Sequence, residues 1–168
     1  MTTIYLIRHA EAEGNLYRRV HGWYDSRITD RGFRQIAALE ERFRDIPVDA
    51  VWSSDLLRTR TTARAVYGPK GLELHTTPAL REVGMGEWED LPWGLVARLD
   101  PEGLKWFTDG SPRWGDVTGS ESFAAAQERA WSALRDIAAA NPGGTVAVFS
   151  HGMVIRTLLA RCQGLPPE

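Results

Sequence analysis

The sequence predicts an α/β fold, a three-layer sandwich with a mostly parallel central sheet and helices on both faces. Two short apolar runs, residues 4–7 and 146–149, are rich in β-branched and aromatic residues, which is typical of strands buried on both faces. Helical patterns alternate with strand-like runs in the order β-α-β-α-β, an irregular insert, then α-β-α. Strands that alternate with helices in this way favour a parallel sheet with right-handed crossovers.

The first part of the chain predicts a strand, a long loop and a helix. After the strand at 4–7, residues 10–28 show no convincing helix or strand pattern. A loop of this length inside a compact domain is usually functional. Thr29 is a typical N-cap, and the helix that it opens carries an apolar stripe and ends by Pro47.

The middle of the predicted sheet comes from two strands and the helix between them. These elements are a strand at 50–53, a helix that Ser54 or Asp55 caps and that runs to about Val66, and a strand at about 72–76. The Gly-Pro-Lys-Gly sequence at 68–71 predicts the turn that separates this helix from the last of these strands.

Residues 84–120 form an insert of different composition, with short helices expected near 91–99 and 102–109. Four tryptophans lie there among glycines and prolines: Trp88, Trp93, Trp106 and Trp114. They can cover a small satellite core, or they can form a lid whose aromatic faces line a substrate pocket. The two interpretations are compatible.

The last part of the chain predicts a helix, a strand and a helix. A long helix covers about 122–140, and the Asn-Pro-Gly-Gly sequence at 141–144 ends it. The strand at 146–149 follows, and then a helix at about 153–163 that Gly164 closes. We expect residues 1–168 to form one domain that contains the insert.

Composition limits the partners. The 168 residues are 43% hydrophobic and 25% charged, as in ordinary globular proteins, and the net charge of −2 argues against a broad nucleic-acid or membrane surface. No apolar stretch reaches membrane-spanning length, and the start does not resemble a signal peptide. The single cysteine, Cys162, excludes an internal disulfide and fits a reducing compartment, so we expect a cytoplasmic protein. The sequence leaves the oligomeric state open.

Side chains with catalytic chemistry follow the ends of the predicted strands. Arg8 and His9 come after the first strand and His151 after the last, while Arg58 lies early in the helix after the second strand. Glu82 lies a few residues past the third strand. Residues just past the carboxyl ends of parallel strands line the ligand crevice of an open α/β sheet. We therefore expect two imidazoles, two guanidiniums and a carboxylate to meet in a site for an anion, which we expect to be a phosphate.

These residues belong to spaced motifs that resemble the histidine phosphatase (phosphoglycerate mutase-like) superfamily. The motifs are Arg8-His9-Ala10-Glu11, Asn15, Gly22, Asp25, Thr29-Asp30-Arg31-Gly32 with Gln35, Ser53-Ser54-Asp55-Leu56-Leu57-Arg58-Thr59, Leu80-Arg81-Glu82 with Gly86-Glu87-Trp88-Glu89, Glu121-Ser122 and Ser150-His151-Gly152. They span nearly the whole chain in the family's order, and the resemblance implies the phosphoglycerate mutase-like fold.

The resemblance also implies catalytic roles. His9 would be the nucleophile, forming a phosphohistidine, and Arg8 and Arg58 would bind the phosphoryl oxygens through their guanidinium forks. His151 would add charge or a hydrogen-bond donor to the same oxygens. Glu82 would protonate the leaving alkoxide and then activate water. Glu87 and Glu89 lie close to Glu82 in sequence and are the alternatives for this last role.

Further residues complete the predicted substrate-binding set. Asn15 would supply a neutral hydrogen-bond donor, and Gly22 and Gly152 are assigned to the same substrate-binding set. The cationic side chains would stabilise the transferring phosphoryl group, so we expect no metal and no cofactor. The other two histidines, His21 and His75, are interpreted as incidental.

The chain departs from the family pattern at several positions. Ala10 and Ala12 stand where Gly and a hydroxyl residue are frequent, Arg27 replaces a frequent Pro, and Met153 replaces a frequent Gly. Family members usually continue past the final helix with a further strand and helix. One interpretation is therefore a truncated version of a longer protein, whose fold lacks the C-terminal strand and helix and whose sheet has an unpaired edge.

The expected function is metal-independent hydrolysis of small phosphorylated metabolites through a phosphohistidine. A cofactor-dependent phosphoglycerate mutase is the alternative within the family, although mutases are generally longer with larger inserts. A non-catalytic phosphoester-binding module is the alternative from another class, but a pure binder does not need the predicted general acid. The sequence does not identify the physiological substrate.

Overall fold

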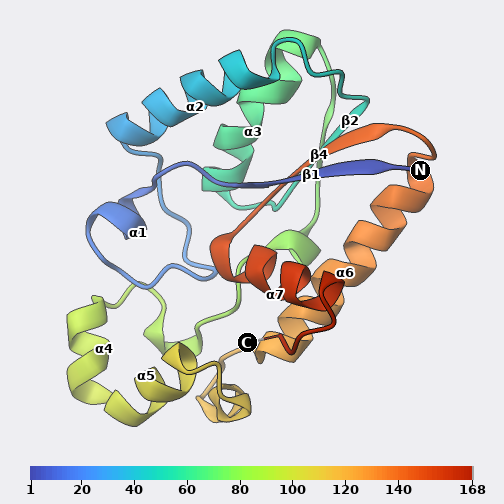
Figure 1. Ribbon diagram of the computed structural model, residues 1–168. Helices are drawn as coiled ribbons and strands as arrows, with labels where there is room; N and C mark the ends of the chain where they lie inside the picture. Colours follow the sequence, from blue (N-terminus) through green and yellow to red (C-terminus); the bar gives the residue numbers. More distant parts are fainter. Residues whose placement is uncertain (168) are drawn as a thin grey trace.

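The computed structural model describes residues 1–167, which contain a four-stranded parallel sheet in the order β1-β4-β2-β3 (Figure 1). The strands are β1 (Thr3–Arg8), β2 (Ala50–Ser53), β3 (Leu74–Thr76) and β4 (Thr145–Ser150). Strand β4 lies between β1 and β2, and all three pairings are parallel. Val146 to Phe149 are fully buried in this position, which explains their uninterrupted apolar sequence.

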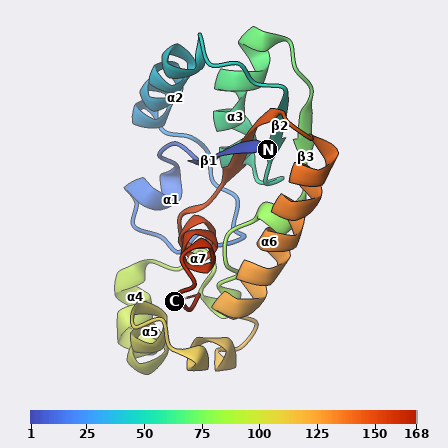
Figure 2. The same cartoon turned by 45° about the vertical axis from the view of Figure 1, so that its right-hand side comes forward.

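Helices cover both faces of the sheet, which confirms the predicted three-layer sandwich (Figures 1 and 2). Ala147 and Phe149 pack in one cluster with side chains of α2 (Asp30–Phe43) and α3 (Leu57–Lys70). Val146 and Val148 pack in the other cluster with α6 (Phe123–Ala140) and α7 (Gly152–Cys162). Successive strand residues point to opposite faces, so a single apolar strand supplies both halves of the core.

The predicted N-cap is right for α2 and wrong for α3, and α6 is capped by Ser122. Thr29 accepts a hydrogen bond from the Gly32 N–H at 3.1 Å, and Ser122 accepts one from Ala125 N–H at 3.1 Å. The N-cap of α3 is instead Leu56, because the Ser54 hydroxyl and the Asp55 carboxylate contact His151 and Arg81. Ser54 and Asp55 are suitable N-cap residues by type, but in the folded chain their side chains interact with distant residues instead of capping α3.

The turn predicted at 68–71 is mostly helix. Helix α3 continues through Gly68 and Pro69 to Lys70, and only Gly71 leaves it, with a left-handed φ of 64°. A glycine adopts this conformation without the steric cost that a β-carbon brings, so it ends the helix as a C-cap. Strand β3 is accordingly shorter than predicted and begins at Leu74.

The remaining helices are short and lie in the loop 10–28 and near the insert. They are α1 (Glu13–Leu16), α4 (Trp93–Leu99), α5 (Pro101–Thr108) and three 3₁₀ helices, η1 (Pro78–Leu80), η2 (Gly86–Trp88) and η3 (Pro112–Asp116). The predicted insert helices are confirmed as α4 and α5. Helix α1 is a single turn that the sequence did not predict.

The insert tryptophans contribute to the main core. Trp88 and Trp114 are 4% and 0% exposed, their ring centroids lie 4.8 Å apart, and Phe107 lies 5.0 Å from Trp114. This aromatic cluster is continuous with the core beneath α6 and α7. Trp88 and Trp114 are thus core residues as expected, but they belong to the main core and not to a small satellite core. A lid function of residues 84–120 stays a prediction.

Helix α7 is the last element in the described part of the chain, and no strand follows β4 there. Within residues 1–167, β1 pairs with β4 alone, so it forms one edge of the sheet. Among the helices of residues 1–167, none combines the length and the apolar character that spanning a membrane would need.

Candidate active site

The parallel sheet brings the chain segments that carry the candidate residues to the edge formed by the carboxyl ends of its strands. Arg8 ends β1 opposite Ser150 of β4, and Ser53 ends β2 opposite Phe149 of β4. His9 and His151 each follow directly, and their ring centroids lie 5.2 Å apart. Parallel pairing in register therefore places two imidazoles from opposite ends of the sequence side by side.

A pocket of about 210 Å³ opens at this edge. Its lining includes five of the predicted residues, namely Arg8, His9, Asn15, Gly22 and Glu82. The other lining residues are Val20, His21, Met85, Trp93, Phe107 and Met153. Arg58 and His151 are fully buried behind this surface. Gly152 lies against Arg8, since a β-carbon at residue 152 would stand 3.4 Å from the Arg8 guanidinium carbon.

The ring of His9 is held in one tautomer. Its Nδ1 lies 2.7 Å from the carbonyl oxygen of Ala10, which can only accept, so Nδ1 carries the proton and Nε2 has the lone pair. Burial, followed by the nearby Arg58 guanidinium, lowers the pKa of His9 from 6.5 to about 3. The imidazole is therefore neutral at physiological pH and presents a nucleophilic nitrogen.

Arg58 donates most of its hydrogen bonds to the loop that forms the pocket wall. Its Nη1 donates to Tyr24 O at 2.8 Å, and its Nη2 donates to His21 O at 3.0 Å and to Gly22 O at 2.7 Å. Its Nε is buried and has no hydrogen-bond partner in the described part of the chain. Burial lowers the pKa of Arg58 to about 10, so the group still carries its charge at neutral pH.

His151 is completely buried at the start of α7. Its Nε2 lies 3.0 Å from Ser54 Oγ, and its Nδ1 has no hydrogen-bond partner among residues 1–167. Burial and then the Arg58 charge hold the pKa of His151 well below its ordinary value. A buried polar atom without a partner is rare in native proteins, and a bound ligand is one explanation for it.

Among the three candidate glutamates, only Glu82 lines the pocket. Its carboxylate accepts backbone hydrogen bonds from Val83 at 3.0 Å and from Met153 and Val154 at 3.1 Å, the last two at the N-terminus of α7. Burial raises the pKa of Glu82, and these N–H donors and Arg58 oppose the rise. Glu89 instead accepts from backbone N–H groups of Trp23, Tyr24 and Met85, and Glu87 is exposed.

His21, interpreted from sequence as incidental, is a wall of the pocket. Asn15 Oδ1 accepts from Ala12 N–H at 3.0 Å, so Asn15 Nδ2 faces His21 Nε2 at 3.1 Å. The His21 ring lies 5.8 Å from the His9 ring, and burial lowers the pKa of His21 to about 4. Its position beside Gly22 in a matched motif was the available signal. His75 is exposed and does not line the pocket, and its ring centroid lies 4.9 Å from that of Trp52.

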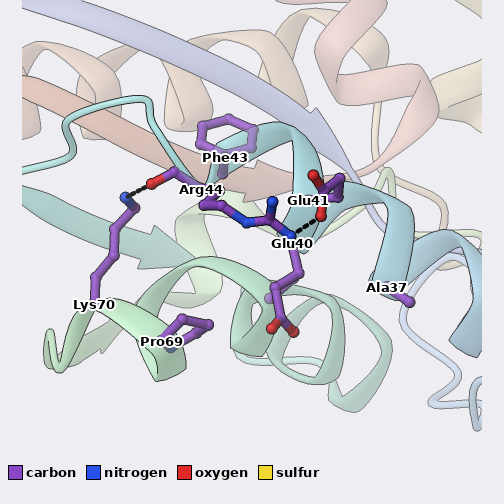
Figure 3. A pocket seen from close by; sticks show the side chains of 8 residues that line it. Ala37, Glu40, Glu41, Phe43, Arg44, Pro69 and Lys70 are labelled. Atoms are coloured by element: carbon purple, nitrogen blue, oxygen red, sulfur yellow. Dashed lines mark hydrogen bonds and ion pairs between the residues drawn. The ribbon is translucent and has the colours of Figure 1, made fainter.

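A second hollow, of about 340 Å³, lies between α2 and α3 (Figure 3). Two interactions lie along it: the Arg44 and Glu41 side chains form an ion pair, and Lys70 Nζ donates to the backbone carbonyl oxygen of Arg44 at 3.3 Å. It shares no lining residue with the pocket at the strand ends.

Across residues 1–167, no group of three or more His, Cys, Asp and Glu side chains is placed to hold a metal ion.

Residues 4–168 match the histidine phosphatase superfamily (branch 1), and the chain belongs to this superfamily. The probable phosphoglycerate mutase GpmB of Yersinia pestis is 34% identical over 169 residues, which cover 99% of this chain and 77% of the relative. The chain is an enzyme of the phosphatase class with the phosphoglycerate mutase-like fold, as its structural neighbours also indicate.

Two solved structures illustrate this likeness. The YhfR protein of Bacillus stearothermophilus matches with a TM-score of 0.94 and 31% identity, covering 99% of this chain and 82% of that one. The α-ribazole phosphatase of Shigella flexneri matches with a TM-score of 0.85 and 27% identity, covering 98% of this chain and 81% of that one.

Proposed function

We propose that this chain is a metal-independent phosphomonoesterase that hydrolyses small phosphorylated metabolites through a phosphohistidine on His9. The observation that carries the proposal is the tautomer of His9. Its Nδ1–H is committed to Ala10 O, which leaves the Nε2 lone pair available in a pocket that also contains Arg8. A small pocket of about 210 Å³ suits a phosphoryl group and a compact leaving group.

In the first proposed step, His9 Nε2 attacks phosphorus and the bond from phosphorus to the leaving oxygen breaks. The Glu82 carboxylic acid gives its proton to that oxygen, so the product leaves as an alcohol. In the second step, a water molecule attacks the phosphohistidine and gives its proton to the Glu82 carboxylate. Inorganic phosphate is released, and His9 and Glu82 return to their starting states. The raised pKa of Glu82 supports the proton-carrying role.

Charge on the phosphoryl oxygens needs donors that are already in place before the reaction. The exposed Arg8 guanidinium lines the pocket, and the Nε of Arg58 and Nδ1 of His151 are buried donor positions without partners in the described chain. Phosphoryl oxygens would satisfy these atoms. We assign Asn15, Gly22 and Gly152 to the same binding set, and we add His21, which holds the amide of Asn15.

Hydrolysis of para-nitrophenyl phosphate in excess chelator, by the parent chain and by His9→Ala, tests the proposal. We expect the parent to retain activity in chelator and His9→Ala to lose it, with an acid-labile phosphoenzyme in the parent only. Activity that disappears in chelator would contradict the metal-free mechanism. Equal turnover by both proteins would exclude His9 as the nucleophile, and binding of vanadate without turnover would favour the binding module.

The second candidate is phosphoglycerate mutase activity, which is favoured by the similarity to the probable phosphoglycerate mutase of Yersinia pestis. A mutase keeps the phosphoryl group on the enzyme and returns it to the product, whereas a phosphatase gives it to water. Incubation with 3-phosphoglycerate separates the two activities, because isomerisation without phosphate release would identify a mutase.

We also propose a cytoplasmic location, which the exposed free thiol of Cys162 supports.

A further inference from the structure

The segment 79–82, which carries Glu82, has each of its carbonyl groups bonded to a side chain from elsewhere. Ala79 O and Arg81 O each accept from Arg129 Nη1 at 2.8 Å, and Leu80 O accepts from Ser150 Oγ at 2.8 Å. Glu82 O accepts from Arg129 Nη2 at 2.8 Å and from Trp23 Nε1 at 2.8 Å. The segment lies outside the sheet and α-helices, so side chains replace the regular backbone partners.

Arg129 provides three of these five hydrogen bonds from the middle of α6. Its guanidinium is also paired with Glu121, through Nε at 2.6 Å and Nη2 at 2.7 Å. Glu121 Oε2 in turn accepts from Gly84 N–H at 3.2 Å, just beyond Glu82. The two side chains are 21% and 16% exposed, so the pair is mostly shielded from water. Together they fix the backbone on both sides of Glu82.

The placement of Glu82 depends on this backbone. Its carboxylate accepts from Met153 and Val154 N–H, which lie at the start of α7. A shift of the 79–84 segment would move the carboxylate away from these donors and from the leaving group. Arg129 meets only the backbone carbonyl of Glu82, so it acts through position rather than by touching the substrate.

We propose that Arg129, held by Glu121, is a positioning residue for the general acid of this enzyme. This inference rests on the proposed role of Glu82. It predicts a defect that depends on the leaving group. An alkyl phosphate needs protonation of its leaving oxygen, whereas the nitrophenolate of para-nitrophenyl phosphate leaves with little help.

The test compares kcat/KM for β-glycerophosphate and para-nitrophenyl phosphate, because this quantity reports the steps up to release of the leaving group. For Arg129→Gln we expect a loss on the order of 100-fold with β-glycerophosphate, the usual contribution of general acid catalysis, and a much smaller loss with para-nitrophenyl phosphate. Glu121→Gln should show the same selectivity more weakly. Arg135→Gln, on an exposed position of the same helix, is the matched control and should match the parent.

Equal losses on both substrates would overturn the proposal, since general damage to the fold does not distinguish leaving groups. A second measurement does not depend on activity. Hydrogen exchange of the Met153 and Val154 amides should accelerate in Arg129→Gln as it does in Glu82→Ala, while the Ile155 amide, bonded to His151 O, should not change. Unchanged exchange at both amides would also overturn it. Inactivity of the parent would instead refute the proposed function and leave the exchange test decisive for positioning.

Discussion

The imidazole of His21 packs directly on the α-carbon of Gly14. A β-carbon at residue 14 would stand 2.4 Å from His21 Cγ and 2.6 Å from His21 Nδ1, which is closer than real atoms approach. Gly14 lies in the single turn α1, so this contact connects two parts of the loop 10–28, one of which supplies His21 to the pocket wall. The absence of a side chain at residue 14 thus determines where the third imidazole of the pocket lies.

Gly14→Ala should therefore displace His21 and weaken phosphate binding. We expect destabilisation of about 1–3 kcal/mol from the forced contact, together with weaker inhibition by vanadate. Gly94→Ala is the matched control, because a β-carbon there meets nothing within 4 Å and α4 should gain about 0.5–1 kcal/mol from the better helix former. Thermal unfolding and vanadate titration measure both effects. Tight vanadate binding by Gly14→Ala would disprove the link between Gly14 and the pocket.

Protonation of the buried histidines should make the fold acid-sensitive. The pKa of His9 is lowered to about 3 in the folded chain and stays near 6.5 in the unfolded chain. The unfolded state therefore binds more protons between these values, so stability from His9 is present above pH 6.5 and is lost as pH falls toward 3. Integrating this difference gives about 2 kcal/mol between pH 7 and pH 5.

Urea unfolding of the parent and of His9→Gln at pH 7 and pH 5 measures that contribution. The parent should lose about 2 kcal/mol more than the variant over this interval. His21 and His151 have pKa values lowered in the same direction, so the variant keeps part of the pH dependence. An identical pH dependence in both proteins would show that His9 is not held neutral by the fold.

Arg58→Lys should damage both stability and activity despite the conserved charge. The guanidinium donates to three carbonyl groups of residues 21–24, and a lysine ammonium cannot reproduce this planar fork. Carbonyl groups left without donors cost about 1–3 kcal/mol each when buried. We expect a lower midpoint in urea and a reduction of kcat/KM for para-nitrophenyl phosphate. Arg64→Lys, on an exposed position of the same helix, should change neither quantity.

The tryptophans of the insert should differ sharply in their contribution to stability. Trp114 is fully buried in the aromatic cluster, so Trp114→Ala should cost about 3–5 kcal/mol. Trp106 is only partly buried, and the Arg113 guanidinium carbon lies 4.0 Å from its ring centroid. Trp106→Ala should therefore cost distinctly less than Trp114→Ala. It loses about 1 kcal/mol from the cation–π contact, together with the packing of a partly exposed ring. Chemical denaturation compares the two variants. Similar costs would mean that the burial of Trp114 does not dominate its role.

The sequence predicted the elements whose signals are local. The apolar runs at 4–7 and 146–149 are the strands β1 and β4, and Thr29 is the N-cap that its residue type indicated. It failed at Ser54 and Asp55, which are good caps in isolation. Their partners in the folded chain, His151 and Arg81, lie 97 and 26 residues away, and no local pattern reports such contacts.

By itself, then, the sequence determined the parallel α/β sandwich and the groups that follow each strand, because hydrophobic periodicity and strand order depend on neighbouring residues. Only the tertiary structure decided that Glu82 rather than Glu89 lines the pocket and that His21 belongs to it. It also decided that the Arg58 guanidinium donates its hydrogen bonds to carbonyl groups of residues 21–24. These choices are made in irregular loops. Their side chains find partners tens of residues away, and spacing along the chain does not fix the direction of those contacts.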